Sequence, residues 1–168
     1  TTFLLAAALS AAGQAPYDGP TLEERLKAEK PENLAADARK SGDPRRGAIL
    51  FHQAHVTCSR CHVGEQGKPP IGPDIGLIEK SATDAYLIES ILYPSKEIKK
   101  GFATVKIATR DGRSFSGILL EENAERLTLR DLAADGKPVT IAKADIEERS
   151  SNAPSSMPTG LVNGLRGR

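Results

Sequence analysis

The apolar positions divide the chain into a first part with helical spacing and a later part with a period of two. Three helix-start signals lie near the beginning of the first part. A Thr-x-x-Glu capping box at Thr21 predicts a short helix, and Pro31 opens a second helix over about 32–40. Asp43 followed by Pro44 combines an N-cap with a first-turn proline and predicts a third helix, which leads toward residue 51.

A fourth helix is expected further along the chain. It begins within residues 81–84 and ends before Pro94, which cannot continue a helix. Its apolar face consists of Leu87, Ile88, Ile91 and Leu92. We therefore expect a helical region that extends to about residue 100.

From Phe102 onward apolar and polar residues alternate, as they do in half-buried strands. Ala103, Val105 and Ile107 fall on one side of the first strand. Two Asp-Gly pairs, at 111–112 and 135–136, are turn signals between later strands. The other alternating positions are Leu127 and Leu129, Val139 and Ile141, and the segment 145–147. The pattern predicts an antiparallel β-meander of four or five short strands, and it resembles small SH3-like or Sm-like barrels.

Composition narrows the possible functions. The 23 Lys and Arg residues nearly balance the 22 Asp and Glu residues, so we expect no nucleic-acid partner. The chain has no Trp, three Tyr and four Phe, so apolar burial depends on aliphatic residues. A large buried prosthetic group would supply much of the core area that aromatic side chains usually provide.

The first residues of the chain have the composition of a targeting segment. Residues 1–13 are uncharged, mostly apolar, and end in small residues, like the hydrophobic and cleavage regions of a secretory signal. The run is shorter than the roughly 20 residues that a membrane-spanning helix needs. We expect the protein to be exported, to the periplasm or elsewhere outside the cytoplasm. The alternative is that residues 1–13 stay attached as a membrane anchor.

The candidate chemistry is concentrated in Cys58-Ser-Arg-Cys61-His62. Two thiols at this spacing can form thioethers with the vinyl groups of one porphyrin, and the imidazole that follows can bind its iron. The motif predicts one covalent haem c with His62 as an axial ligand. The alternatives are a periplasmic disulfide or a zinc site that adds His52 and His55 to the two cysteines. Ligation of a haem by two histidines is a further alternative.

The preferred candidate for the sixth iron position is Met157. Met157 is the only methionine, and it lies in a polar loop where packing in an apolar core is a poor explanation for it. A thioether ligand favours Fe(II) and raises the reduction potential, and it is the usual choice for electron transfer. The sequence supplies no distal acid/base pair, which favours a carrier over a haem enzyme or a gas or redox sensor with an open sixth site.

Segments on both sides of the motif resemble class I cytochromes c. The helix that carries Gly47 and Phe51 resembles their N-terminal helix, in which a glycine and an aromatic residue pack against the C-terminal helix. The stretch Gly72-Pro73-Asp74 resembles their Gly-Pro-Asp/Asn segment. This resemblance implies that the carbonyl of Pro73 accepts a hydrogen bond from the non-ligating nitrogen of His62, which fixes the tautomer and orientation of the ring.

Residues 43–161 as a whole resemble a haem-binding domain family that is abundant in planctomycetes and related bacteria. In that family the domain is often the C-terminal module of large exported dehydrogenase-like chains, and the methionine equivalent to Met157 is the expected distal ligand. Class I cytochromes and this family continue with a C-terminal helix, whereas only residues 162–168 follow here. We expect either that the chain is truncated or that a partner covers this haem edge.

The expected fold class is α+β, with a helical cytochrome c-like haem domain and an inserted small antiparallel β-meander or SH3-like barrel. The expected divisions are a signal or anchor (1–15), a helical extension or linker (16–42), the first part of the haem domain (43–100), the β-module (101–149) and the distal-ligand loop (150–168).

The expected function is one-electron transfer by an exported mono-haem cytochrome that is not an enzyme. Its partners would be redox proteins, including a larger membrane-associated or dehydrogenase complex. A structural or docking subunit of such a complex is an alternative, in which the β-module would be the partner-binding part.

Overall fold

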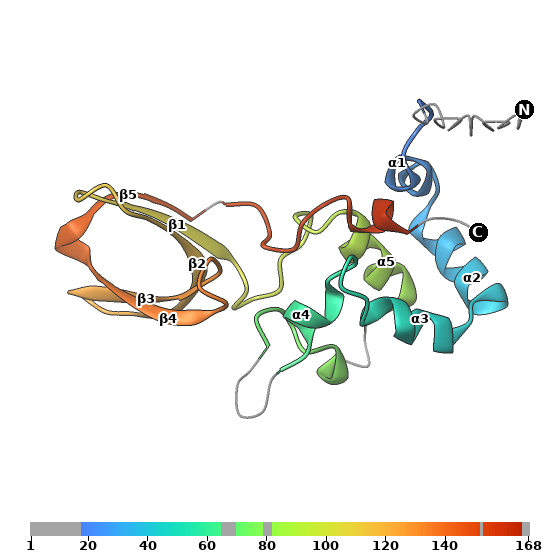
Figure 1. Cartoon of the computed structure of the whole chain (residues 1–168), viewed down its shortest axis with the longest axis horizontal. Coiled ribbons are helices and arrows are strands. Elements are labelled where there is room, and N and C mark those ends of the chain that lie inside the picture. The colour runs from blue at the N-terminus through green and yellow to red at the C-terminus, as the bar shows by residue number, and fades with distance from the viewer. Residues whose placement is uncertain (1–17, 65–69, 79–81, 152, 166–168) are drawn as a thin grey trace, which may run out of the picture.

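The computed structural model describes residues 18–64, 70–78, 82–151 and 153–165, and its architecture is α+β. Helices gather at one end of the molecule and a sheet forms the other (Figure 1). The helices are α1 (Leu22–Lys27), α2 (Pro31–Ser41), α3 (Pro44–Phe51), α4 (Cys58–His62) and α5 (Asp84–Leu92). Short 3-10 turns are η1 (Ile75–Leu77), η2 (Lys143–Asp145) and η3 (Leu161–Gly164). The expected signal or anchor at residues 1–15 lies outside the described residues.

The helix starts follow the predicted caps. Thr21 and Glu24 form the reciprocal capping box of α1. The carboxylate of Asp43 accepts hydrogen bonds from the backbone N–H groups of Arg45 (2.8 Å) and Arg46 (3.3 Å), which caps α3. These local predictions are confirmed. Within the described part of the chain, no helix has the length and apolar character needed to cross a membrane.

Helices α2 and α5 pack side by side. The guanidinium of Arg39 on α2 donates to the carboxylate of Asp84 on α5, with Nη2 and Oδ1 2.9 Å apart. Leu92 is buried, as its place on the apolar face predicts. Ile91 is 42% exposed, so its predicted burial is wrong. The face of α5 that contacts other elements is narrower than the apolar pattern implies.

The second part of the chain forms a five-stranded antiparallel sheet in the order β4-β3-β2-β1-β5. The strands are β1 (Thr104–Thr109), β2 (Ser114–Glu122), β3 (Arg126–Asp131), β4 (Lys137–Ala142) and β5 (Ile146–Ser150). The alternation is confirmed at its centre, where the buried cluster consists of Val105, Ile107, Leu127, Leu129 and Ile141. Ala103 is exposed and precedes β1, so its predicted place in that strand is wrong.

Both Asp-Gly pairs occur in turns, as predicted. Gly112 has a φ of 83° in the turn between β1 and β2. Between β3 and β4, Asp135 (φ 51°) and Gly136 (φ 75°) are both left-handed, a conformation that Asp and Gly tolerate better than other residues. The second turn faces the helical end of the molecule, and its contacts are part of the site described below.

An ion-pair cluster on the sheet gives it a pH dependence. Arg149 and Lys143 each approach the carboxylate of Glu122 to 2.7 Å and lower its pKa from 4.5 to about 2, with Arg149 as the larger cause. Because the pKa of Glu122 is lowered, these ion pairs stabilise the folded protein fully above pH 4.5, and the stabilisation is lost as the pH falls to about 2.

We expect Glu122→Gln to remove this part of the pH dependence of stability, measured as the unfolding midpoint between pH 6 and pH 2. Glu121→Gln, on the same strand, is the control and should follow the wild type. An unchanged acid slope in Glu122→Gln would contradict the assignment.

Candidate functional site

The Cys-x-x-Cys-His segment forms the single-turn helix α4. Residues three and four apart are neighbours on a helix, so Cys58, Cys61 and His62 present their side chains to one side. Thr57, just before the helix, has a φ of 60°, a conformation that costs about 1–3 kcal/mol for a residue other than glycine. The chain therefore enters the motif through a strained residue.

The two thiols are half-buried and are not joined in a disulfide. Burial raises the pKa of the Cys58 thiol above 9.0, and the neighbouring Cys61 raises it further. The Cys58 thiol is therefore protonated at neutral pH.

The imidazole of His62 is held by the segment that follows the motif. Its Nδ1 lies 2.7 Å from the carbonyl oxygen of Pro73, the contact that the cytochrome resemblance implies. The backbone N–H of Gly72 donates to the carbonyl of Cys61 at 2.7 Å, which ties the two segments together. Because a carbonyl oxygen only accepts, Nδ1 carries the proton and Nε2 keeps a lone pair for a metal ion.

Gly72 belongs to the Gly-Pro-Asp segment noted in the sequence, but the sequence alone assigns it no role at the site. A Cβ atom at Gly72 would lie 3.0 Å from Cε1 and 3.2 Å from Nδ1 of His62. The φ of Gly72 is not in the left-handed region, so it is the nearness of the imidazole, and not the backbone, that requires glycine here. The only sequence signal was a glycine directly before Pro73.

We expect Gly72→Ala to displace the His62 ring at a cost of about 1–3 kcal/mol, as for an added methyl group in a packed site. The measurement is thermal unfolding together with the absorption spectrum of the protein purified with its cofactor. Gly47→Ala is the matched control, because a Cβ there meets no atom within 4 Å and alanine favours the helix. Equal stability of the Gly72 and Gly47 variants would show that the close contact is unimportant.

Met157 and the motif line the same cavity. This cavity, of about 430 Å³, is bounded by Cys58, Cys61 and His62 on one side and by Met157 from the end of the chain. Its other apolar walls are Ile71, Pro94, Ile98, Phe102, Leu132, Pro158 and Leu161. The fold thus brings Met157 to the same cavity as Cys58, Cys61 and His62, which lie together much earlier in the sequence.

The loop of Met157 is held by hydrogen bonds. The backbone N–H of Met157 donates to Oγ of Ser155 (3.2 Å), and the backbone N–H of Ser155 donates to Oγ of Ser95 (3.1 Å). Ser95 lies just after α5, so the loop is attached to the helical end of the molecule, although the five-stranded sheet separates the two segments in the sequence. Met157 is half-buried in this position.

A second, larger cavity of about 910 Å³ adjoins the first. The two cavities share the walls His62, Gly72, Pro73, Lys99 and Phe102. The larger one is lined by neither cysteine nor by Met157, so only the smaller cavity brings all four predicted site residues together. The lining of the larger cavity includes four exposed apolar side chains: Val63, Ile75, Leu77 and Leu120.

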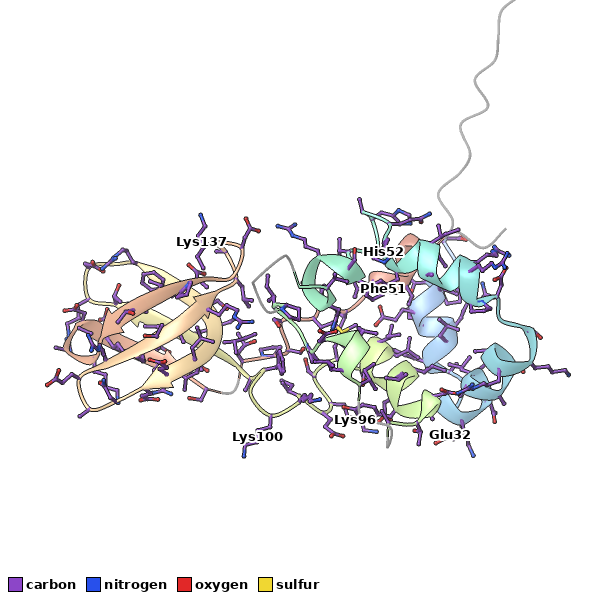
Figure 2. All side chains as sticks on the ribbon, turned by 90° about the horizontal axis from the view of Figure 1, so that it is seen from below. Glu32, Phe51, His52, Lys96, Lys100 and Lys137 are labelled. Atoms are coloured by element: carbon purple, nitrogen blue, oxygen red, sulfur yellow. The ribbon has the colours of Figure 1, made fainter. Side chains whose placement is uncertain are left out.

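The two other histidines are not brought to the site. His52 and His55 are exposed and line neither cavity. His52 packs edge-on against Phe51 with ring centroids 5.1 Å apart, and Figure 2 labels both at the end of α3. Among the residues that the structure describes, no three His, Cys, Asp or Glu side chains gather closely enough to hold a metal ion. The zinc and bis-histidine alternatives therefore gain no support.

Helix α3 has an open face. Ile49 is 61% exposed and Gly47 has open space around it. The packing of Gly47 and Phe51 against a C-terminal helix, which the cytochrome resemblance implies, is not formed in the described part of the chain, where Phe51 lines the larger cavity instead. The chain end is held elsewhere, since Oδ1 of Asn163 in η3 accepts from the backbone N–H of Glu23 at 2.8 Å.

The helical end of the molecule has a small core of its own. Among its described residues, Ala35, Val56 and Leu92 are buried, whereas α3 and α4 contain no buried residue. Exposed apolar side chains are costly when they cluster. A haem in the cavity between the motif and Met157 would cover apolar walls and supply the missing core, so the residues present fit this cofactor.

No family model matches the chain, and a search of curated proteins finds no match. The resemblance to cytochromes therefore rests on the motifs and on the geometry described above.

Proposed function

We propose that this chain is a c-type cytochrome that carries one covalent haem and transfers single electrons. The observation that supports the proposal most strongly is the single cavity in which Cys58, Cys61, His62 and Met157 meet. The contact between His62 Nδ1 and the Pro73 carbonyl adds to it, because it leaves Nε2 available for iron.

A bound haem supplies the one-electron Fe(III)/Fe(II) couple. The thiols of Cys58 and Cys61 would attach it to α4, and His62 and Met157 would hold its iron. A thioether ligand favours the reduced state. Pro73 keeps the His62 ring in one tautomer and orientation, and Gly72 makes room for that ring. The apolar side chains of the cavity would limit the access of water to the group and so help to set its reduction potential.

The proposal includes a finer description of the fold. We interpret the helical end as a cytochrome c-like haem domain and the five-stranded sheet as an SH3-like insertion between its two parts. The apolar segment at residues 1–13 supports export, with the periplasm as the simplest destination.

The proposed partners are redox proteins. Helix α3 offers an open apolar face at Ile49 and Leu50 close to the cationic Arg45 and Arg46 at its start. A partner on this face would approach Phe51 and the larger cavity. This is consistent with the chain acting as the electron-transfer part of a larger oxidoreductase.

The absorption spectrum tests the proposal. His/Met ligation predicts a low-spin spectrum with a weak sulfur-to-iron charge-transfer band at the red end in the oxidised protein. A high-spin spectrum that shifts on addition of cyanide or CO would instead favour the enzyme or sensor alternative. A purified protein without haem absorption would contradict the proposed function altogether.

A further inference from the structure

The sheet contributes walls to both cavities. Ile118 and Leu120 of β2 and Arg130 of β3 line the larger cavity, and Leu132 and Asp135 of the following turn line the smaller one. The inserted module therefore does not stand apart from the candidate haem site. Its β3–β4 side forms part of that site.

Three contacts join this side of the sheet to the motif and to the segment at residues 70–71. Nη2 of Arg60, inside the Cys-x-x-Cys segment, lies 2.9 Å from Oδ1 of Asp135. Nη1 of Arg130 donates to the carbonyl of Pro70 at 2.6 Å. Gly136 packs so closely on Ile71 that an added Cβ would lie 3.1 Å from its Cγ1. The left-handed turn at residues 135–136 is thus shaped to approach the motif.

Arg130 is the unusual member of this set. It is half-buried, and its aliphatic stem lies against Gly136, where an added Cβ would be 3.4 Å from Cγ and Cδ. No carboxylate pairs with it within the part of the chain that the structure describes. A guanidinium at the wall of a largely apolar cavity is suited to bind an anion, and its planar donor set fits a carboxylate.

Haem brings such an anion. Its two propionate carboxylates are on the half of the porphyrin opposite the vinyl groups, so attachment to Cys58 and Cys61 directs them away from the cysteines. The larger cavity is lined by neither cysteine and shares His62, Gly72 and Phe102 with the smaller one. We propose that the sheet is a structural wall of the haem site and that Arg130 on β3 binds a haem propionate. The inference rests on the proposed haem function.

The pairing has a measurable consequence. A guanidinium that neutralises a propionate destabilises the more positive Fe(III) state, so removing it should lower the reduction potential. Arg130→Met removes the charge and keeps the aliphatic stem on Gly136, while Arg130→Gln removes the charge and keeps an N–H donor for the Pro70 carbonyl. Arg126→Met, an exposed arginine on the same strand, is the matched control.

The experiment is a potentiometric titration of each holoprotein. Both Arg130 variants should shift the ratio of oxidised to reduced protein about tenfold at a fixed potential, equivalent to about 59 mV for one electron. Arg126→Met should stay within about twofold of the wild type. The inference is overturned if neither Arg130 variant shifts, if only Arg130→Met shifts, or if Arg126→Met shifts equally. A wild-type protein without haem refutes the proposed function, whereas a haem-loaded wild type with unshifted Arg130 variants refutes this inference alone.

Discussion

Replacing Met157 by alanine is expected to abolish the sulfur-to-iron charge-transfer band of the oxidised protein and to lower its reduction potential. Axial ligands set haem potentials over a range of about 0.8 V, and loss of a thioether should lower the potential by on the order of 0.1–0.3 V. The haem should remain covalently attached, because the thioether bonds would be formed by Cys58 and Cys61 and not by Met157. Absorption spectroscopy and potentiometry of the same sample measure both effects.

Leu161→Ala is the control for this variant. Leu161 lines the same cavity but has no atom that can bind iron, so its truncation should keep the band and shift the potential much less. Persistence of the band in Met157→Ala would refute the ligand assignment. Equal loss of the charge-transfer band in Met157→Ala and Leu161→Ala would mean that the band depends on the packing of the cavity and not on the methionine sulfur.

Changing both Cys58 and Cys61 to serine is expected to abolish covalent haem attachment. Serine keeps the size of the side chain and the geometry of α4, and it removes the thiol that adds to a vinyl group. Acidified organic solvent should then extract any residual haem from the polypeptide, whereas the wild type should retain it through the same treatment. Haem staining of a denaturing gel measures the difference.

Ser59→Ala is the control on the same helical turn and should retain covalent haem. Haem that remains attached in the double-serine variant would refute the thioether assignment. A wild type that instead contains zinc, lost in the double variant, would revive the zinc alternative, which the positions of His52 and His55 do not support.

The features that were predictable are those set by neighbouring residues. Thr21, Pro31 and Asp43 begin helices because caps and first-turn prolines act within one turn. The alternation that buries Leu127 and Leu129 is equally local. The Cys-x-x-Cys-His motif identified its candidate cofactor because the chemistry requires those residue types at that spacing.

The features that were missed depend on contacts between distant segments. Gly72 is required by the ring of His62, and Arg130 reaches the site from a strand far along the sequence. Ile91 is exposed although it lies on the apolar face of its helix. The periodicity shows which face is apolar, but not how much of that face the neighbouring elements cover. The sheet had also been expected as a possible separate docking module, and its contacts through Asp135 and Arg130 could not be read from an alternating pattern.

The central claim is that Cys58 and Cys61 carry a haem, and the intact mass of the purified protein under denaturing conditions tests it most directly. The account predicts the mass of the polypeptide plus one haem, unchanged by denaturation because thioethers do not dissociate. The mass of the bare polypeptide, or of that polypeptide less two hydrogen atoms for a disulfide, would contradict it.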